Sequence, residues 1–218
     1  MAQHAGGLPE ATISRLPLYH RALLEAAELK ELTVSSERIA ELTGLNAAKI
    51  RKDLSHLGTY GTRGVGYNVE QLMHQIAREL GLTEDWAIAI VGFGNLGQAL
   101  ANYKGFLERG FEVVAIFDAD PSKEGMSTTG GAVVMPIDQL KAISSRKRID
   151  IAIIATPASS AQEVADLVVA AGITSILNFA PQVLAVPEGV SVRKVDLSIE
   201  LQILSFYKQR TRMKTAEG

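Results

Sequence analysis

The chain has 218 residues, of which 47% are hydrophobic, a mean hydropathy of +0.12 and a formal net charge of −2. This composition is sufficient for one large or two modest packed domains, and the small net charge excludes attraction of the whole molecule to polyanions, so nucleic-acid binding would require a local basic patch. The absence of cysteine excludes disulfides, thiolate metal sites and a cysteine nucleophile.

The first 80 residues have the apolar spacing of helices. Leucine and alanine recur every three or four residues between Leu18 and Leu29, with Pro17 in the expected first turn. Further apolar spacings predict two short helices and a helix over 69–80. The expected helix caps are Ser14, Ser35 or Ser36, Asn46 and Asn68, and the expected stops are Gly44 and Gly58.

Two of these short helices, joined at Gly44-Leu45, form a helix-turn-helix pattern in which the second is the recognition helix. The basic side chains on this helix and in the following loop are accompanied by a single acid, Asp53. The glycine-rich stretch 58–66 is expected to form a β-wing with Arg63 at its tip. The alternative is a solvated helix face followed by an ordinary hairpin. The residues expected to contact DNA are Lys49, Arg51, Lys52, Ser55, Arg63 and Gly64.

Residues 92–97 read Gly-Phe-Gly-Asn-Leu-Gly, directly after an apolar run over 86–91. In a strand–turn–helix setting, Gly92 permits the tight turn, Gly94 lets the backbone approach a pyrophosphate, and Gly97 lets the helix pack closely on the strand. The N-terminus of the following helix offers N–H groups and a partial positive charge to phosphates. The motif predicts a dinucleotide-binding turn.

The next predicted strand, 112–118, ends in Asp118. This acid follows Gly97 by about 20 residues, the spacing of the carboxylate that binds the ribose hydroxyls in dinucleotide-binding folds. No Arg or Lys follows Asp118 before Lys123, so no cation is expected to meet a 2′-phosphate, and NAD is preferred over NADP. The alternative is a plain strand–turn–helix with an N-capping acid nearby.

From residue 86 onward, runs rich in Ile, Val and Ala alternate with amphipathic segments, which predicts an α/β fold with a doubly wound parallel sheet. The expected strands are 86–91, 112–118, 131–135, 149–157, 174–179 and 190–195, and the expected helices are 95–109, 138–145, 159–171 and 198 to about 210. The domain organisation predicted is a winged-helix DNA-binding domain over 1–80, a linker over 81–85, a Rossmann NAD(H)-binding domain over 86–197, and a C-terminal helix with a polar tail over 198–218.

Catalytic groups are missing from this pattern. All four histidines precede the predicted nucleotide-binding domain, and the chain has no nucleophile elbow, no metal-ligand spacing and no room for a separate substrate domain. We therefore expect binding of a dinucleotide without turnover. The alternatives are a small NAD-dependent dehydrogenase with a helical dimerisation domain, and a non-enzymatic subunit that binds coenzyme A, whose phosphorylated ribose Asp118 would repel.

Two further absences concern location. The N-terminal residues show no basic segment followed by an apolar stretch, so no signal peptide is visible. No apolar run approaches the roughly 18 residues that a membrane span requires. We expect a cytoplasmic protein.

The combination of a winged helix and an NAD-type domain strongly resembles the Rex family of bacterial redox-sensing repressors, over nearly the whole chain. His56-Leu57 stands where aromatic residues are frequent in that family, which leaves operator preference open. The segments that carry the resemblance are Arg51-Lys-Asp-Leu-Ser55, Gly61-Thr-Arg-Gly-Val-Gly-Tyr67, Val91-Gly-Phe-Gly-Asn-Leu-Gly97, Asn178-Phe-Ala-Pro181 and Val195-Asp-Leu197.

The resemblance implies a homodimer that binds inverted-repeat operator DNA when NADH is scarce and releases it when NADH binds. NADH and NAD⁺ are then effectors that are not consumed, and NAD⁺ does not drive release. The C-terminal helix would swap between subunits, although by itself it could also pack on its own subunit.

The resemblance also implies roles for individual residues. Tyr103 would lie near the nicotinamide, and Asp196 would respond to it and pair with Arg21 in the DNA-competent state. The alternatives are that Tyr103 is a half-buried helix residue and that Asp196 caps the last helix. The full set of expected cofactor-binding residues is Gly92, Phe93, Gly94, Asn95, Leu96, Gly97, Tyr103, Asp118, Thr156, Pro157, Asn178 and Asp196.

Overall fold

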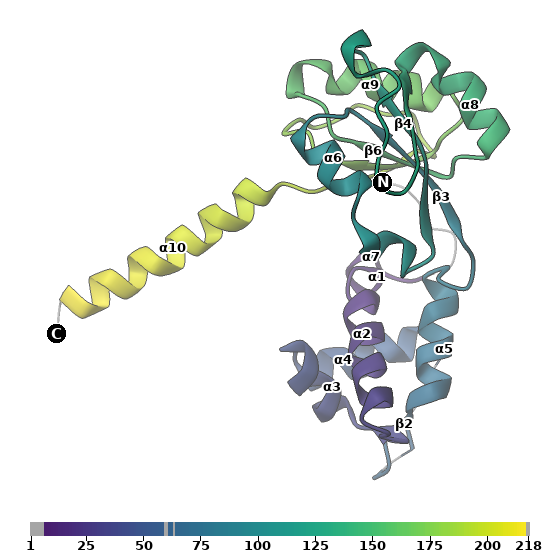
Figure 1. Cartoon of the computed structure of the whole chain (residues 1–218). Coiled ribbons are helices and arrows are strands. Elements are labelled where there is room, and N and C mark those ends of the chain that lie inside the picture. Colours follow the sequence, from purple (N-terminus) through teal and green to yellow (C-terminus); the bar gives the residue numbers. More distant parts are fainter. Residues whose placement is uncertain (1–6, 59–60, 63, 217–218) are drawn as a thin grey trace. The chain divides into compact units, whose positions relative to one another are not determined.

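The computed structural model describes residues 7–58, 61–62 and 64–216. Its contacts divide the chain into two compact units, Met1–Glu84 and Asp85–Gly218 (Figure 1). The first unit is mostly helical. Its elements are α1 (Glu10–Ile13), α2 (Leu16–Glu28), β1 (Thr33–Val34), α3 (Ser36–Thr43), α4 (Ala47–His56), β2 (Tyr67–Asn68) and α5 (Val69–Glu79).

Side-chain caps set where the helices of the first unit begin. Oxygens of Ser35, Asn46 and Asn68 accept hydrogen bonds from backbone N–H groups in the first turns of α3, α4 and α5, which confirms these predicted caps. The prediction that Ser14 caps α2 is wrong. Its hydroxyl donates to the carbonyl oxygen of Glu10 at 3.0 Å, so this serine closes α1 instead of opening the next helix.

The glycine-rich segment expected to form a wing leads into β2, which pairs antiparallel with β1. The sequence pattern did not predict β1. Gly66 precedes β2 with a φ of +97°, and a Cβ there would overlap the carbonyl oxygen of Val34, so only glycine fits.

One apolar core joins the helices of the first unit. Its largest fully buried side chains are Tyr19, Leu16, Leu23, Ile39, Ile50, Leu54, Leu72 and Ile76.

The second unit contains a six-stranded parallel sheet, ordered β5-β4-β3-β6-β7-β8. This order is that of dinucleotide-binding folds, and the strand order reverses beside the central strand β3. The predicted doubly wound parallel sheet is confirmed. The strands are β3 (Trp86–Val91), β4 (Phe111–Asp118), β5 (Val134–Pro136), β6 (Ile151–Ile154), β7 (Ser175–Asn178) and β8 (Ser191–Lys194).

Helices cover both faces of this sheet. Ala89 and Val91 of β3 pack in the core formed with α8 (Leu140–Lys147) and α9 (Ala158–Ala170). Ile88 and Ile90 of the same strand point to the other face, where α6 (Asn95–Ala101) and α7 (Lys104–Leu107) contribute to the core. The central strand is therefore apolar on both sides, as the near-continuous run of Ile and Ala predicted.

The helix predicted over 95–109 is wrong in its length, because α6 and α7 are separated at Asn102 and Tyr103. The Asn102 side chain donates to the carbonyl of Gln98 at 2.8 Å, and its oxygen accepts from the backbone N–H and the hydroxyl of Thr129, at 2.9 and 2.6 Å. These contacts tie the end of α6 to a distant loop, and α7 begins anew after the break.

The C-terminal helix α10 (Leu197–Ala216) is longer than predicted and includes most of the expected polar tail. Its described side chains are exposed, among them those of Leu201, Leu204, Phe206 and Tyr207. A search of the described residues finds no helix with the length and apolarity that crossing a membrane demands.

Candidate functional site

The glycine turn lies at the carboxyl end of β3, against the loop that follows β6. Gly92 has a φ of +101°, and a Cβ at this position would lie 2.6 Å from the carbonyl oxygen of Ala155. A Cβ at Gly97 would overlap the carbonyl oxygen of Gly92. Two loops thus meet at the point where the strand order reverses, which is where ligands bind in open α/β sheets.

The turn presents the start of α6 to solvent. Gly94 is the N-cap of α6, and Gly94, Asn95 and Leu96 are exposed. The first N–H groups of a helix have no partner within the helix, and its N-terminus carries a partial positive charge. Backbone groups in this setting can hold a pyrophosphate.

Phe93 plays a different part in the turn. Its ring is buried in the sheet core, and its backbone N–H donates to Asp118 Oδ2 at 2.6 Å. The amide of Phe93 is therefore committed to the protein, and this residue links the glycine turn to the acid at the end of β4.

Thr156 closes the opposite side of the turn. Its Cγ2 lies 2.9 Å from the place that a Cβ on Gly92 would take, and the exposed Pro157 then leads into α9. Within the described residues, the Oγ1 of Thr156 is the one buried side-chain polar atom that finds no hydrogen-bond partner. A buried hydroxyl without a partner is unfavourable, and a bound ligand could supply one.

Asp118 ends β4, and its carboxylate is partly buried and accepts several hydrogen bonds. Besides the N–H of Phe93, it accepts from the backbone N–H of Asp120 at 2.9 Å and from Lys123 Nζ at 2.9 Å. Burial opposes ionisation, but the hydrogen bonds from Asp120, Phe93 and Lys123 outweigh it and lower the pKa of Asp118. The ion pair also corrects an expectation, because a cation does stand beside the acid that would meet a ribose.

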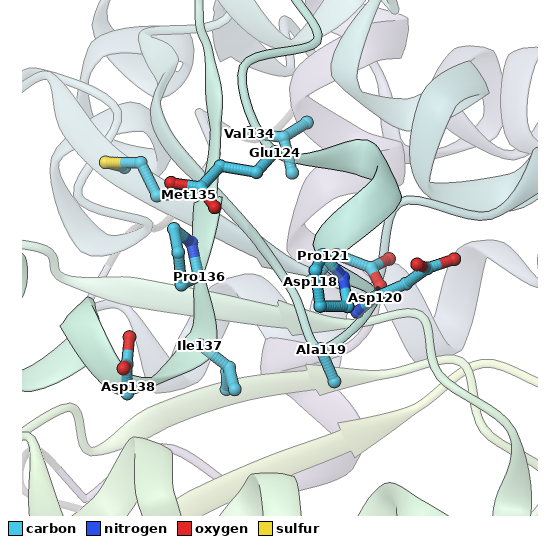
Figure 2. Close-up of a pocket in the computed structure, with 10 residues that line it drawn as sticks. All are labelled: Asp118, Ala119, Asp120, Pro121, Glu124, Val134, Met135, Pro136, Ile137 and Asp138. Atoms are coloured by element: carbon cyan, nitrogen blue, oxygen red, sulfur yellow. Dashed lines mark hydrogen bonds between the residues drawn. The ribbon is translucent and has the colours of Figure 1, made fainter.

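A cavity of about 290 Å³ adjoins Asp118 (Figure 2). Figure 2 shows that its lining comes from two segments, 118–124 after β4 and 134–138 at β5 and the turn beyond it. Apolar groups of Val134, Pro136 and Ile137 form part of the wall. An apolar wall of this kind suits a flat base. The carboxylates that also line it, and that disfavour an additional phosphate, are Asp118, Asp120, Glu124 and Asp138.

Asn178 lies at the end of β7 and is buried. Its side-chain oxygen accepts from the N–H of Ala180 at 2.9 Å, and its NH₂ group donates to the carbonyl of Gln182 at 2.9 Å. The amide is therefore used at both ends by its own turn. It shapes the loop at the edge of the sheet where the glycine turn also lies.

Tyr103 lies between α6 and α7, with its ring 5.2 Å from that of Phe106 in an edge-on arrangement. It is exposed and lines an apolar groove with side chains of the sheet, including Ile88, Ile151 and Leu177. Tyr103 is thus no half-buried helix residue.

Asp196 precedes α10. Its Oδ1 accepts from the hydroxyl and the backbone N–H of Ser198, at 2.6 and 3.1 Å, and its Oδ2 pairs with Lys194 Nζ at 3.2 Å. The hydrogen bonds from Ser198, followed by that from Lys194, lower the pKa of Asp196. The capping arrangement that the sequence left open is present. Arg21, its expected partner, is exposed on α2 in the other unit.

The expected DNA-contacting face of α4 is exposed at Lys49, Arg51 and Lys52, while Ile50 and Leu54 of the same helix are buried. With its basic side chains exposed and its apolar side chains buried, α4 can present cations to a DNA groove and remain packed in its own domain. The residues predicted to contact DNA also include Ser55, Arg63 and Gly64. The Ser55 hydroxyl donates to the carbonyl of Lys52 at 2.7 Å, Gly64 is exposed in the wing, and Arg63 lies outside the described residues.

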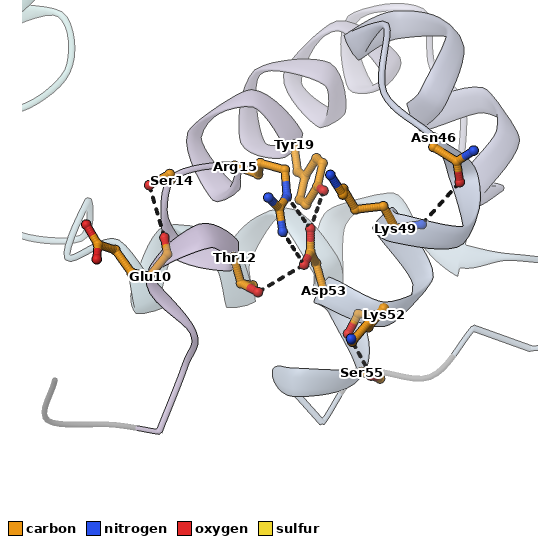
Figure 3. Close-up of polar contacts among 10 residues, drawn as sticks. All are labelled: Glu10, Thr12, Ser14, Arg15, Tyr19, Asn46, Lys49, Lys52, Asp53 and Ser55. Atoms are coloured by element: carbon orange, nitrogen blue, oxygen red, sulfur yellow. Dashed lines mark hydrogen bonds and ion pairs between the residues drawn. The ribbon is translucent and has the colours of Figure 1, made fainter. Parts of the chain in front are cut away.

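Asp53, which is buried one turn after Lys49 in α4, has a structural role that sequence reasoning missed. Figure 3 shows its carboxylate surrounded by side chains of α1, α2 and the turn between them: it accepts from Thr12 Oγ1 at 2.9 Å, from Arg15 Nε and Nη2 at 2.6 and 2.7 Å, and from Tyr19 OH at 2.6 Å. Burial opposes its ionisation, but the bonds from Arg15, Tyr19 and Thr12 prevail and lower the pKa of Asp53. This network ties α4 to α1 and α2.

No group of three or more His, Cys, Asp or Glu side chains suited to a metal ion occurs in the part of the chain that the structure describes. The residues present fit a dinucleotide instead: a glycine cradle, a hydroxyl without a partner and a carboxylate beside an apolar cavity lie at neighbouring strand ends.

Two family models match the chain. The model described as "CoA binding domain" matches residues 83–182, and that described as "Putative DNA-binding protein N-terminus" matches residues 7–55. The redox-sensing transcriptional repressor Rex of Streptomyces griseus is 60% identical over 209 residues, which cover 96% of this chain and 82% of the relative.

Two similar solved structures are those of RSP. In complex with β-NAD⁺ and operator DNA, RSP has a TM-score of 0.88 and 38% identity, with 95% of each chain covered. In complex with β-NADH it has a TM-score of 0.85 and 36% identity, covering 97% of this chain and 99% of RSP. The match in both cases spans the two units.

Proposed function

The chain belongs to the Rex family of redox-sensing transcriptional repressors, which are not enzymes, and we propose that it binds operator DNA when NADH is low and releases it when NADH binds. The observation that carries the proposal is the coexistence, in one chain, of a cationic helix-turn-helix and a glycine cradle with a ribose-type acid. Neither NADH nor NAD⁺ is consumed in this role.

In the dinucleotide site, the N–H groups from Gly94 to Gly97 would hold the pyrophosphate, and Asp118 would accept from the adenosine ribose. A carboxylate has about four lone-pair positions, and three hydrogen bonds to Asp118 leave one for a ribose hydroxyl. Thr156 Oγ1 would gain its missing partner from the ligand, and Pro157 and Asn178 would shape the neighbouring loops. When bound, the nicotinamide supplies the redox-dependent charge that is sensed.

The sensing step requires that NADH bind one arrangement of the protein better than the other. NAD⁺ carries a positive charge on its ring that NADH lacks, so a carboxylate favours the oxidised form and an apolar surface the reduced one. We assign the first part to Asp196, and we propose that Tyr103 lies near the nicotinamide. Breaking an Arg21–Asp196 pair would then accompany the release of DNA.

On the DNA side, Lys49, Arg51 and Lys52 would contact phosphates or base edges from α4, with Ser55 beside them and the wing at Arg63 and Gly64 entering the adjacent groove. The RSP complex supports this assignment, because RSP binds operator DNA together with β-NAD⁺. An operator with inverted repeats requires a symmetric protein, so we further propose a homodimer.

The exposed apolar side chains of α10 support a dimer in which this helix packs on the partner subunit. Burying large side chains such as Leu201, Leu204 and Phe206 would stabilise the assembly by about 1.5–3 kcal/mol for each one fully buried. Removing residues 198–218 should therefore yield monomers or loose dimers in sedimentation velocity. An intact NADH-responsive dimer after this truncation would contradict the role of α10.

A repressor acts where the genome is, so we propose a cytoplasmic location. The domain organisation proposed is a DNA-binding domain over 1–80, a linker over 81–85, an NAD(H)-binding domain over 86–197 and the dimerising helix from 198.

Calorimetric titration with NADH, NADPH and coenzyme A tests the ligand assignment. We expect NADH to bind, and the two phosphorylated-ribose ligands to bind at least tenfold more weakly because of the carboxylates around the cavity. If coenzyme A, the ligand named by one of the two matching family models, bound more tightly than NADH, then NADH would not be the effector.

A further inference from the structure

The side chain of Arg51 already makes hydrogen bonds to other residues of the same domain. Its Nη1 donates to Glu37 Oε1 at 2.7 Å and to Ser36 Oγ at 2.8 Å. The Ser36 hydroxyl in turn donates to Glu37 Oε2 at 3.2 Å. A guanidinium has five N–H donors, and these contacts use only the Nη1 end, so Arg51 is oriented by α3 while the rest of its fork can still meet a ligand.

The contact lies at the expected DNA interface. Arg51, Ser36 and Glu37 line a cleft whose other wall is the wing, including Thr62 and Tyr67. The side chains of Arg51 and Glu37 are 52% and 63% exposed, so their ion pair is solvated and weak. A pair of this strength can be exchanged for DNA.

The Glu37 carboxylate and a DNA phosphate compete for Arg51 by the same chemistry. Both are anions that accept hydrogen bonds from guanidinium nitrogens. The edge of a guanine offers two neutral acceptors instead, which an arginine can grip with two donors without displacing a charge. A carboxylate next to Arg51 therefore penalises capture by phosphate more than it penalises recognition of a base.

We propose that Glu37 is a specificity-determining residue of the repressor: it holds Arg51 away from DNA phosphates and so lowers affinity for non-operator DNA. The inference rests on the proposed role of α4 as the DNA-recognition helix. Glu37 supplies the repulsive element that discrimination between competing partners requires. It acts through Arg51 and does not itself read a base.

The chain offers a matched control on the same helix. Glu41 is also exposed on α3 and pairs with Arg38 Nη1 at 3.3 Å. Arg38 is held in addition by Glu31 at 2.9 Å, so removing the Glu41 carboxylate leaves that arginine paired. Glu37→Gln and Glu41→Gln thus make the same change in charge, but only the first releases an arginine.

The test is fluorescence anisotropy of full-length variants with an operator duplex and a scrambled duplex of equal length, across a series of salt concentrations. For Glu37→Gln we expect scrambled DNA to bind about threefold to tenfold more tightly than to wild type, with a lower operator-to-scrambled ratio. The slope of log K against log salt should be steeper by about two, because each subunit of the proposed dimer releases one arginine. For Glu41→Gln we expect less than about a twofold change. Equal effects of the two variants, or an unchanged slope for Glu37→Gln, would overturn the proposal.

A double-mutant cycle shows whether Glu37 acts through Arg51. In an Arg51→Ala background, the effect of Glu37→Gln should shrink to that of Glu41→Gln. Retention of the full effect there would mean that Glu37 repels DNA directly, which contradicts the proposal. Failure of the wild type to bind operator at all would instead refute the proposed function, so the two failures are distinguishable.

Discussion

Asp53 in the first unit and Asp118 in the second are both carboxylates that accept several hydrogen bonds, and the two are held differently. Asp53 receives its four hydrogen bonds from side chains of α1, α2 and the turn between them, at 2.6–2.9 Å. Asp118 receives two of its three from backbone N–H groups and the third from a lysine, at the rim of a cavity.

The difference separates a structural acid from one that we propose binds a ligand. The partners of Asp53 are fixed by packing and fill its accepting positions, so its role ends within the protein. Asp118 is oriented by backbone groups that cannot leave, while Lys123, on a flexible stem, can move aside for a ribose. A carboxylate that keeps one exchangeable partner beside a cavity is suited to bind; one saturated by buried donors is suited to hold helices together.

Asp53→Asn should have the largest effect, and it should act on the stability of the DNA-binding unit. It removes the charge opposite Arg15 in a buried pair, so we expect the free energy of unfolding of the DNA-binding unit to fall by about 3 kcal/mol. Urea unfolding followed by circular dichroism measures this. Operator affinity should fall with it, while NADH affinity stays at the wild-type value; a variant as stable as wild type would remove Asp53 from its structural role.

The same variant has a predicted pH signature. Because the pKa of Asp53 is lowered in the folded protein, its stabilising contribution is fully present above the ordinary aspartate pKa of about 3.9 and is lost as pH falls through the lowered folded value. Wild type should therefore lose stability in acid more steeply than Asp53→Asn. Parallel unfolding curves for the two proteins below about pH 4 would contradict this.

Arg51→Ala comes next, with an expected loss of operator affinity of about 100-fold. Each recognition contact is worth about 1–3 kcal/mol, and a dimer on an inverted repeat makes it twice. Anisotropy with labelled operator gives the affinity, and NADH titration should be unaffected. Unchanged operator binding would mean that α4 is not the recognition helix.

Asp118→Ala should show the reverse pattern. Loss of a hydrogen bond to a charged acceptor, about 2 kcal/mol, predicts NADH binding weaker by about 30-fold, with ligand-free operator affinity intact. Asp138→Asn, at the far side of the cavity lining in Figure 2, is the control and should change NADH affinity much less. Equal NADH affinity in the Asp118 variant would remove this residue from the site.

Thr156→Val is the smallest and most selective change. Because Oγ1 has no hydrogen-bond partner among the described residues, the isosteric valine should leave the melting temperature unchanged or raise it slightly. NADH affinity should nevertheless fall about fivefold, through the loss of about 1 kcal/mol. A destabilised variant with normal NADH affinity would show that Thr156 serves the fold alone.

Local patterns were sufficient to predict much of this arrangement. The glycine turn, the strand before it and the acid at the end of the next strand lie within one strand–helix–strand unit, whose geometry is fixed by spacing. The caps at Ser35, Asn46 and Asn68 act over three residues or fewer. Such features depend only on residues that are close together in the sequence.

The features that the sequence did not predict depend on contacts between distant residues. The partners of Asp53 lie 34 to 41 positions earlier in the chain, and nothing in the periodicity of α4 distinguishes this acid from a solvated one. The break after α6 depends on Thr129, which lies 27 positions after Asn102. The return of Lys123 onto Asp118 spans only five positions, but it requires the turn after β4, which spacing alone does not specify.

The central claim is that one ligand, NADH, controls the affinity of this chain for DNA. Its most direct test is the anisotropy of a labelled inverted-repeat promoter fragment titrated with the protein at fixed salt, with NADH, with NAD⁺ or with neither. The account predicts tight binding that NADH abolishes and an equal concentration of NAD⁺ does not. Tight binding that both ligands leave untouched, or the absence of binding under all three conditions, would contradict it.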